Sequence, residues 1–158
     1  MRSELSATEL IERYLRARGR RYFRGHHDGE YFFILFVGHE RLHVHIEIAP
    51  ADTDTLTVRT TPAYFFPAAD RERLAELADN WNRQNRRTTA IVHESCDQTR
   101  IGVVAQDSCS LAPDVSFEDF ADLADETISS AVDLFAQITP AAEQKPARTL
   151  GTWLKDAG

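Results

Sequence analysis

The 158-residue chain has no run of about 18 apolar residues, which a membrane span would need, and no basic, apolar and small-residue succession at its start. We therefore expect neither a transmembrane helix nor a signal peptide, and we expect a cytoplasmic protein. Lysine is also scarce, since Lys145 and Lys155 are the only two, and we attribute the resulting arginine bias to GC-rich coding. This bias identifies no ligand.

Catalytic signatures are missing as well. The sequence contains no G-x-S-x-G, P-loop, dinucleotide fingerprint or H-E-x-x-H, and its seven glycines are scattered rather than gathered where a phosphate could bind. We therefore expect a non-catalytic protein without a cofactor.

Only two cysteines are present, Cys96 and Cys109. The first lies near the turn of a predicted hairpin and the second beyond the far end of its outgoing strand, so the two should be tens of ångströms apart at about 3.3 Å per residue. We expect two free thiols, as is typical of a reducing compartment.

The composition, with 42% hydrophobic residues, is that of one globular domain. The net charge of −7 is unevenly placed: residues 114–138 hold seven acids and no base, whereas residues 13–24 hold six arginines and no acid. The basic block could attract nucleic acid. No nucleic-acid motif accompanies it, so we favour a block that complements the acidic helix or a partner subunit.

Three helices are predicted. Ser6 and Glu9 form a capping box, with Leu5 and Leu10 as a hydrophobic staple, and this helix should stop at Gly19. Ser116 caps a long acidic helix that Pro140 should close. A middle helix follows Pro67, with an apolar stripe at helical spacing formed by Leu74, Leu77, Ala78 and Trp81. Trp81 is therefore predicted to be a core residue, with Asn80 and Asn82 turned away from the core.

The predicted strands alternate with turn residues. Residues 21–27 and 30–37 flank Asp28-Gly29, a two-residue hairpin pattern. Further strands are expected at residues 42–48 and 56–61, and a second hairpin pairs residues 88–94 with residues 100–106. This order predicts a single α+β domain at residues 1–139, with an antiparallel sheet of five to six strands and helices packed on one face. Residues 140–158 are expected to be a tail or a short docking segment.

The segment LADNWNRQNRRTTAIVHE, with the hairpin and acidic helix that follow it, resembles the YbjN family over residues 6–138. The resemblance implies the fold of type III secretion chaperones, which are homodimers that hold extended segments of other proteins. Members of the family are described as sensory transduction regulators or as chaperone-like, and the resemblance implies no active site.

The stretch YFFILFV at residues 31–37 is apolar on both faces. If its turn holds two or four residues, Tyr31, Phe33 and Leu35 should face the helices. The opposite face would then carry the predicted interaction surface, which consists of Phe32, Ile34, Phe36, His43 and His45. A bulge or an odd-length loop would reverse this assignment.

Two partners could cover this surface. We expect a second copy of the chain, because large exposed apolar patches mark association sites. The alternative is the tail, folded back with Leu150, Trp153 and Leu154. The chain should thus be a homodimer that engages a segment of an unidentified protein client, with no membrane partner.

A different functional class remains open on the same surface. His43, His45 and Glu47 share one strand face at spacings of roughly 7 Å, which a metal could bridge if a neighbouring strand offered another ligand. The sequence shows no obvious one. The alternative function is therefore a small-ligand or metal-binding enzyme that uses the face bearing His43 and His45.

Overall fold

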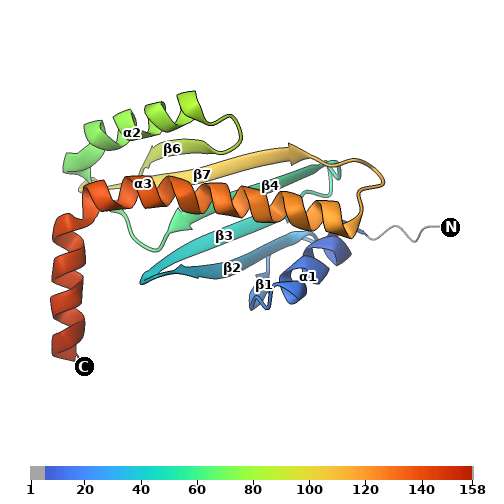
Figure 1. Cartoon of the computed structure of the whole chain (residues 1–158), viewed down its shortest axis with the longest axis horizontal. Coiled ribbons are helices and arrows are strands. Elements are labelled where there is room, and N and C mark those ends of the chain that lie inside the picture. The colour runs from blue at the N-terminus through green and yellow to red at the C-terminus, as the bar shows by residue number, and fades with distance from the viewer. Residues whose placement is uncertain (1–5, 158) are drawn as a thin grey trace.

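The computed structural model describes the backbone of residues 6–157 and the side chains of Ser6 and residues 8–138 (Figure 1). Its elements are, in chain order, α1 (Ala7–Ala17), β1 (Tyr22–Arg24), β2 (Glu30–Val37), β3 (Glu40–Ile48), β4 (Thr55–Pro62), β5 (Phe66–Pro67), a short 3₁₀ turn (Ala68–Asp70), α2 (Arg71–Gln84), β6 (Thr89–Glu94), β7 (Arg100–Ser110) and α3 (Phe117–Ala157). Within residues 6–157, no helix combines the length and apolar character that a bilayer span requires.

The strands form one antiparallel sheet in the order β1-β2-β3-β4-β7. One edge of β7 pairs with β4 and with the two-residue β5, and its other edge pairs with β6. The predicted α+β fold is therefore confirmed. Sequence patterns missed β5, because two residues are too few to show a periodicity.

The core lies on one face of the sheet. Alternate strand residues such as Phe33, Val44 and Val58 are buried there, together with Phe120 and Phe135 of α3. In Figure 1, α3 crosses this face, while α1 lies beside its beginning and α2 lies over β6. Helices thus cover one face, as predicted, and no described element covers the other.

The predicted helix starts are confirmed. The Ser6 side chain accepts a hydrogen bond from the Glu9 amide, and the Glu9 carboxylate accepts one from the Ser6 amide. Gly19 ends α1 with a φ of 65°, a conformation that favours glycine. The Asp119 amide donates to Ser116 Oγ at 3.1 Å at the start of α3. Leu5 of the predicted staple lies outside the described residues.

The prediction of a two-residue turn at Asp28-Gly29 is wrong. β1 ends at Arg24 and β2 begins at Glu30, so the loop between them spans the five residues 25–29. The Gly25 amide donates to the Glu30 carbonyl at 2.7 Å, and the Gly29 carbonyl accepts from the Ile48 amide at 2.9 Å. These two hydrogen bonds, to Glu30 of β2 and Ile48 of β3, stabilise the five-residue loop over a two-residue turn. The pairing of β1 with β2 is therefore shifted by two residues from the one that a two-residue turn would give.

The prediction that Pro140 closes the last helix is also wrong, because α3 continues to Ala157. Figure 1 shows α3 changing direction near its red end. Proline removes one backbone hydrogen bond and bends a helix without always ending it. The side chains of the predicted tail cover, Leu150, Trp153 and Leu154, lie outside those that the structure describes.

The outgoing strand of the second hairpin is longer than predicted. β7 extends to Ser110, so Cys109 lies within the strand and not beyond its end. Cys96 and Cys109 are both free thiols, the first exposed and the second half-buried. Burial raises the pKa of the Cys109 thiol.

Candidate functional site

The open face of the sheet carries an apolar patch at the β1–β2 end. We define this patch as Phe23, Phe32, Ile34 and Phe36, whose exposed fractions are 68%, 40%, 38% and 69%. Phe23 pairs with Phe32 across β1 and β2, so the four side chains lie on the same face. Water therefore contacts large apolar side chains from two adjacent strands.

The predicted interaction surface is brought together by the register of β2 and β3. Gly38 and His39 form a two-residue turn, with a Gly38 φ of 63°. Ile34 then pairs with His43 and Phe32 pairs with His45. These side chains therefore lie on the same face of the sheet, and their role as an interaction surface stays a prediction. Sequence reasoning missed Phe23, whose face depends on the pairing of a three-residue strand.

The two histidines of this surface have different surroundings. His43 is exposed. The His45 ring packs on Phe32, with 4.7 Å between ring centroids, and its Nε2 lies 2.8 Å from Glu30 Oε2. His45 therefore connects the apolar patch to a group of charged residues.

These charged residues form what we call the His–Glu cluster, which contains His27, Glu30, His45 and Glu47. Glu30 pairs with Glu47 across β2 and β3, and His27 reaches over them from the loop. His27 Nε2 lies 2.7 Å from Glu47 Oε2 and 4.0 Å from Glu30 Oε1. The sequence predicted that Glu47 shares a strand face with His43 and His45. In the structure, Glu47 lies beside His27 and Glu30, and His43 lies outside this cluster.

The cluster perturbs the ionisation of its members. The hydrogen bond with His45 is the main cause of the lowered pKa of Glu30. The hydrogen bond of His27 to the Asp28 carbonyl, followed by its bond to Glu47, raises the pKa of His27. Both shifts favour charged side chains at this end of the sheet.

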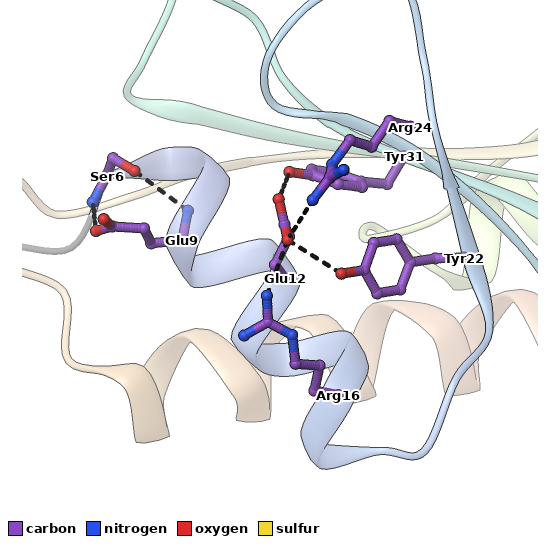
Figure 2. Close-up of polar contacts among 7 residues, drawn as sticks. All are labelled: Ser6, Glu9, Glu12, Arg16, Tyr22, Arg24 and Tyr31. Carbon is purple, nitrogen blue, oxygen red and sulfur yellow. Dashed lines mark hydrogen bonds and ion pairs between the residues drawn. The ribbon is translucent and has the colours of Figure 1, made fainter.

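Beneath the apolar patch, Glu12 of α1 anchors β1 and β2 from the core side (Figure 2). Its carboxylate accepts hydrogen bonds from Tyr31 at 2.6 Å and from Tyr22, Arg24 and Arg16 at 3.0 Å each. The hydrogen bond from Tyr31 is the largest cause that lowers the pKa of Glu12 to about 2. Sequence reasoning missed this residue, because its partners come from three elements.

The basic block of residues 13–24 is largely engaged within the chain. Arg18 binds Asp125 of α3 at 2.6 Å, and the Tyr14 hydroxyl donates to the same carboxylate at 2.6 Å. Arg13 lies over the Phe117 ring, 4.0 Å from its centroid. The prediction that this block complements the acidic helix is confirmed for Arg18.

The N-W-N segment, Asn80 to Asn82, lies within α2, and its side chains bind the backbone at Thr88 and at Ala90 of β6. Trp81 is only 5% exposed, as predicted, and its Nε1 donates to the Thr88 carbonyl at 2.8 Å. Asn82 accepts from the Ala90 amide at 2.8 Å and donates to the Ala90 carbonyl at 3.0 Å. Asn82 is turned away from the core, but it satisfies the outer backbone groups of an edge strand.

A shallow hollow lies at the start of β6, lined by Arg86, Arg87, Thr89, Ile91, Gln106, Asp107 and Ser108. Arg87 contacts Asp107 at 3.5 Å and also pairs with Glu126. Its charge is therefore already balanced within the protein, and we assign no ligand to the hollow.

Comparison with known proteins places this geometry in a family. Residues 7–140 match the YbjN family, described as "Putative bacterial sensory transduction regulator". Among solved structures, the chain is similar to the crystal structure of YbjN, a putative transcription regulator from E. coli, with a TM-score of 0.62 and 16% sequence identity over 83% of this chain and 89% of that one. At this identity, the likeness shows the fold alone. No curated protein matches the sequence. Because the family match spans most of its length, the chain belongs to the YbjN family.

Proposed function

We propose that this protein is a non-catalytic, cytoplasmic regulatory module that forms a homodimer through the apolar patch and engages a segment of another protein. The observation that carries the proposal is the exposure of Phe23, Phe32, Ile34 and Phe36 on a sheet face that no described element covers. Contiguous exposed apolar surface of this kind marks association sites in soluble proteins.

A second copy of the chain is a suitable occupant for a physical reason. In a two-fold dimer, one surface pairs with itself, so a flat patch that is apolar in both copies is complementary without further features. The aromatic side chains supply most of the patch, and aromatic residues are enriched at the centres of interfaces. His43, which is exposed at the border of the patch, would lie at the polar rim.

The free edge of β1 is the place where we expect the client segment to bind. β1 pairs only with β2 among the described strands, so its other edge offers backbone groups for an added strand. The edge of β6, in contrast, is occupied at Ala90 by the side chain of Asn82. An extended client segment should therefore pair with β1, beside the apolar patch.

The proposal is tested by placing one charge in the patch. Ile34→Glu should break association, because a carboxylate in an apolar interface would lose its hydration without a partner. Ile91→Glu is a matched control. Ile91 lies in β6 on the same open face of the sheet and is 37% exposed, but β3, β4 and β7 separate β6 from the apolar patch. Size-exclusion chromatography with light scattering should show dissociation for Ile34→Glu alone. Affinity capture from cell extract with the same two variants tests client binding.

A further inference from the structure

The His–Glu cluster contains an electrostatic conflict that a cation would remove. Glu30 and Glu47 pair directly across β2 and β3, and like charges in such positions destabilise a sheet. Both carboxylates are largely shielded, with side-chain exposures of 13% and 19%. His27 lies against both, so the three residues form a compact group at one end of the open face.

The hydrogen bonding of His27 leaves Nε2 as the ring nitrogen that faces the carboxylates. His27 Nδ1 lies 2.9 Å from the Asp28 carbonyl oxygen, which can only accept, so Nδ1 carries a hydrogen. Nε2 lies 2.7 Å from Glu47 Oε2, so it either donates a hydrogen to that carboxylate when the ring is protonated or shares a cation with it. A metal ion bound to Nε2 and Oε2 would take the place of that proton.

We propose that His27 Nε2, Glu30 Oε1 and Glu47 Oε2 bind a divalent first-row transition cation such as Zn²⁺. One ligand atom from each residue lies within 4.8 Å of the others, and these residues are the only group of this kind among those described. Tetrahedral zinc with bonds of about 2.1 Å needs ligand atoms about 3.4 Å apart. The observed separations of 2.7 and 4.0 Å bracket that value.

The surroundings of the three ligands support the assignment. A histidine that binds a metal commonly donates its other N–H to a carbonyl, as His27 does to Asp28. Glu30 is held by the His26 amide at 2.7 Å and by His45 Nε2 at 2.8 Å. His45 is thus a positioning residue for Glu30, and it is itself packed on Phe32.

Two glycines permit this arrangement. A side chain at Gly25 would collide with the Glu30 carboxylate, and one at Gly29, whose φ is +91°, would collide with the Ile48 carbonyl. A side chain at position 25 would therefore displace the Glu30 carboxylate, and one at position 29 would strain the loop that carries His27. Three protein ligands leave a fourth position for water or for a donor from a bound partner. An imidazole ligand favours zinc, nickel or copper over magnesium and calcium.

Isothermal titration of the metal-stripped, untagged full-length chain with ZnCl₂ tests the proposal. The wild type should bind one ion per chain, and excess MgCl₂ should not displace it. His27→Ala and Glu47→Gln should each weaken binding by about 10-fold or more, whereas His43→Ala, on the same face but outside the cluster, should bind as the wild type does.

Thermal unfolding gives a second measurement on the same proteins. Zn²⁺ should raise the melting temperature of the wild type and of His43→Ala, because a ligand that binds only the native state stabilises it. The rise at the same Zn²⁺ concentration should be smaller for His27→Ala and Glu47→Gln, whose circular dichroism spectra without metal should match that of the wild type. Absence of saturable binding by the wild type, or equal binding by His27→Ala and Glu47→Gln, would overturn the proposal. The dimer proposal is independent of this result, since it is measured by molar mass.

Discussion

Phe32 and His45 lie opposite each other on β2 and β3, with their ring centroids 4.7 Å apart and their planes tilted by 36°. His45 Nε2 is also 2.8 Å from the Glu30 carboxylate. His45 therefore packs on the apolar patch while it binds Glu30 within the His–Glu cluster, so the two features form one continuous surface.

Replacing His45 should change the ionisation of Glu30. The hydrogen bond with His45 is the largest cause of the lowered Glu30 pKa, so His45→Ala should raise the pKa of that carboxyl. Carbon-detected NMR titration of the Glu30 side chain would measure the change. His43→Ala is the control and should leave the titration curve in place; equal curves for wild type and His45→Ala would contradict the assigned contact.

Trp81→Ala should lower the free energy of unfolding by about 3–5 kcal/mol, the usual loss for a large buried aromatic side chain. Trp81 is 5% exposed and donates to the Thr88 carbonyl. Urea denaturation would measure the loss. Glu76→Ala, at an exposed position of the same helix, should cost less than about 0.5 kcal/mol. A loss below about 1 kcal/mol for Trp81→Ala would mean that the tryptophan is not a core residue.

Asn82→Ala should destabilise the fold by about 1–3 kcal/mol, because it removes two hydrogen bonds to Ala90. Asn82→Asp keeps an acceptor for the Ala90 amide but loses the donor to the Ala90 carbonyl. Its loss, measured by urea denaturation, should therefore be intermediate. Hydrogen exchange of the Ala90 amide should accelerate in Asn82→Ala, and unchanged exchange would argue against this bond.

Glu12 should make stability depend on pH. Its pKa is lowered from 4.5 to about 2 in the folded protein, so its stabilisation is complete above pH 4.5 and is lost as the pH falls toward 2. The difference in unfolding free energy between wild type and Glu12→Gln should shrink by about 2 kcal/mol between pH 6 and pH 3. Urea denaturation at both values measures it. A difference that stays constant would show that the carboxylate is not stabilised in its ionised form.

Local patterns predicted the elements whose causes are local. The capping box of Ser6 and Glu9 and the stripe that buries Trp81 depend on residues within a few positions of each other. The alternation in β2 and β3 predicted which side chains share a face, because the Gly38 turn has an even length.

Features that depend on distant partners were missed. The loop of residues 25–29 is set partly by the bond between Gly29 and Ile48, which the Asp28-Gly29 pattern does not contain. The cluster likewise needed His27 above Glu30 and Glu47, a contact that only the folded loop creates. The prediction that the last helix ends at Pro140 was wrong for another reason, because a proline can bend a helix that continues.

The molar mass of the wild type and of Ile34→Glu, measured by light scattering at high micromolar concentration, tests the central claim most directly. We expect the wild type near twice the chain mass of 17.9 kDa. Ile34→Glu should lie near one chain mass and keep its helical circular dichroism, while Ile91→Glu should behave as the wild type does. A wild type with the mass of a single chain at that concentration would contradict the proposed dimer.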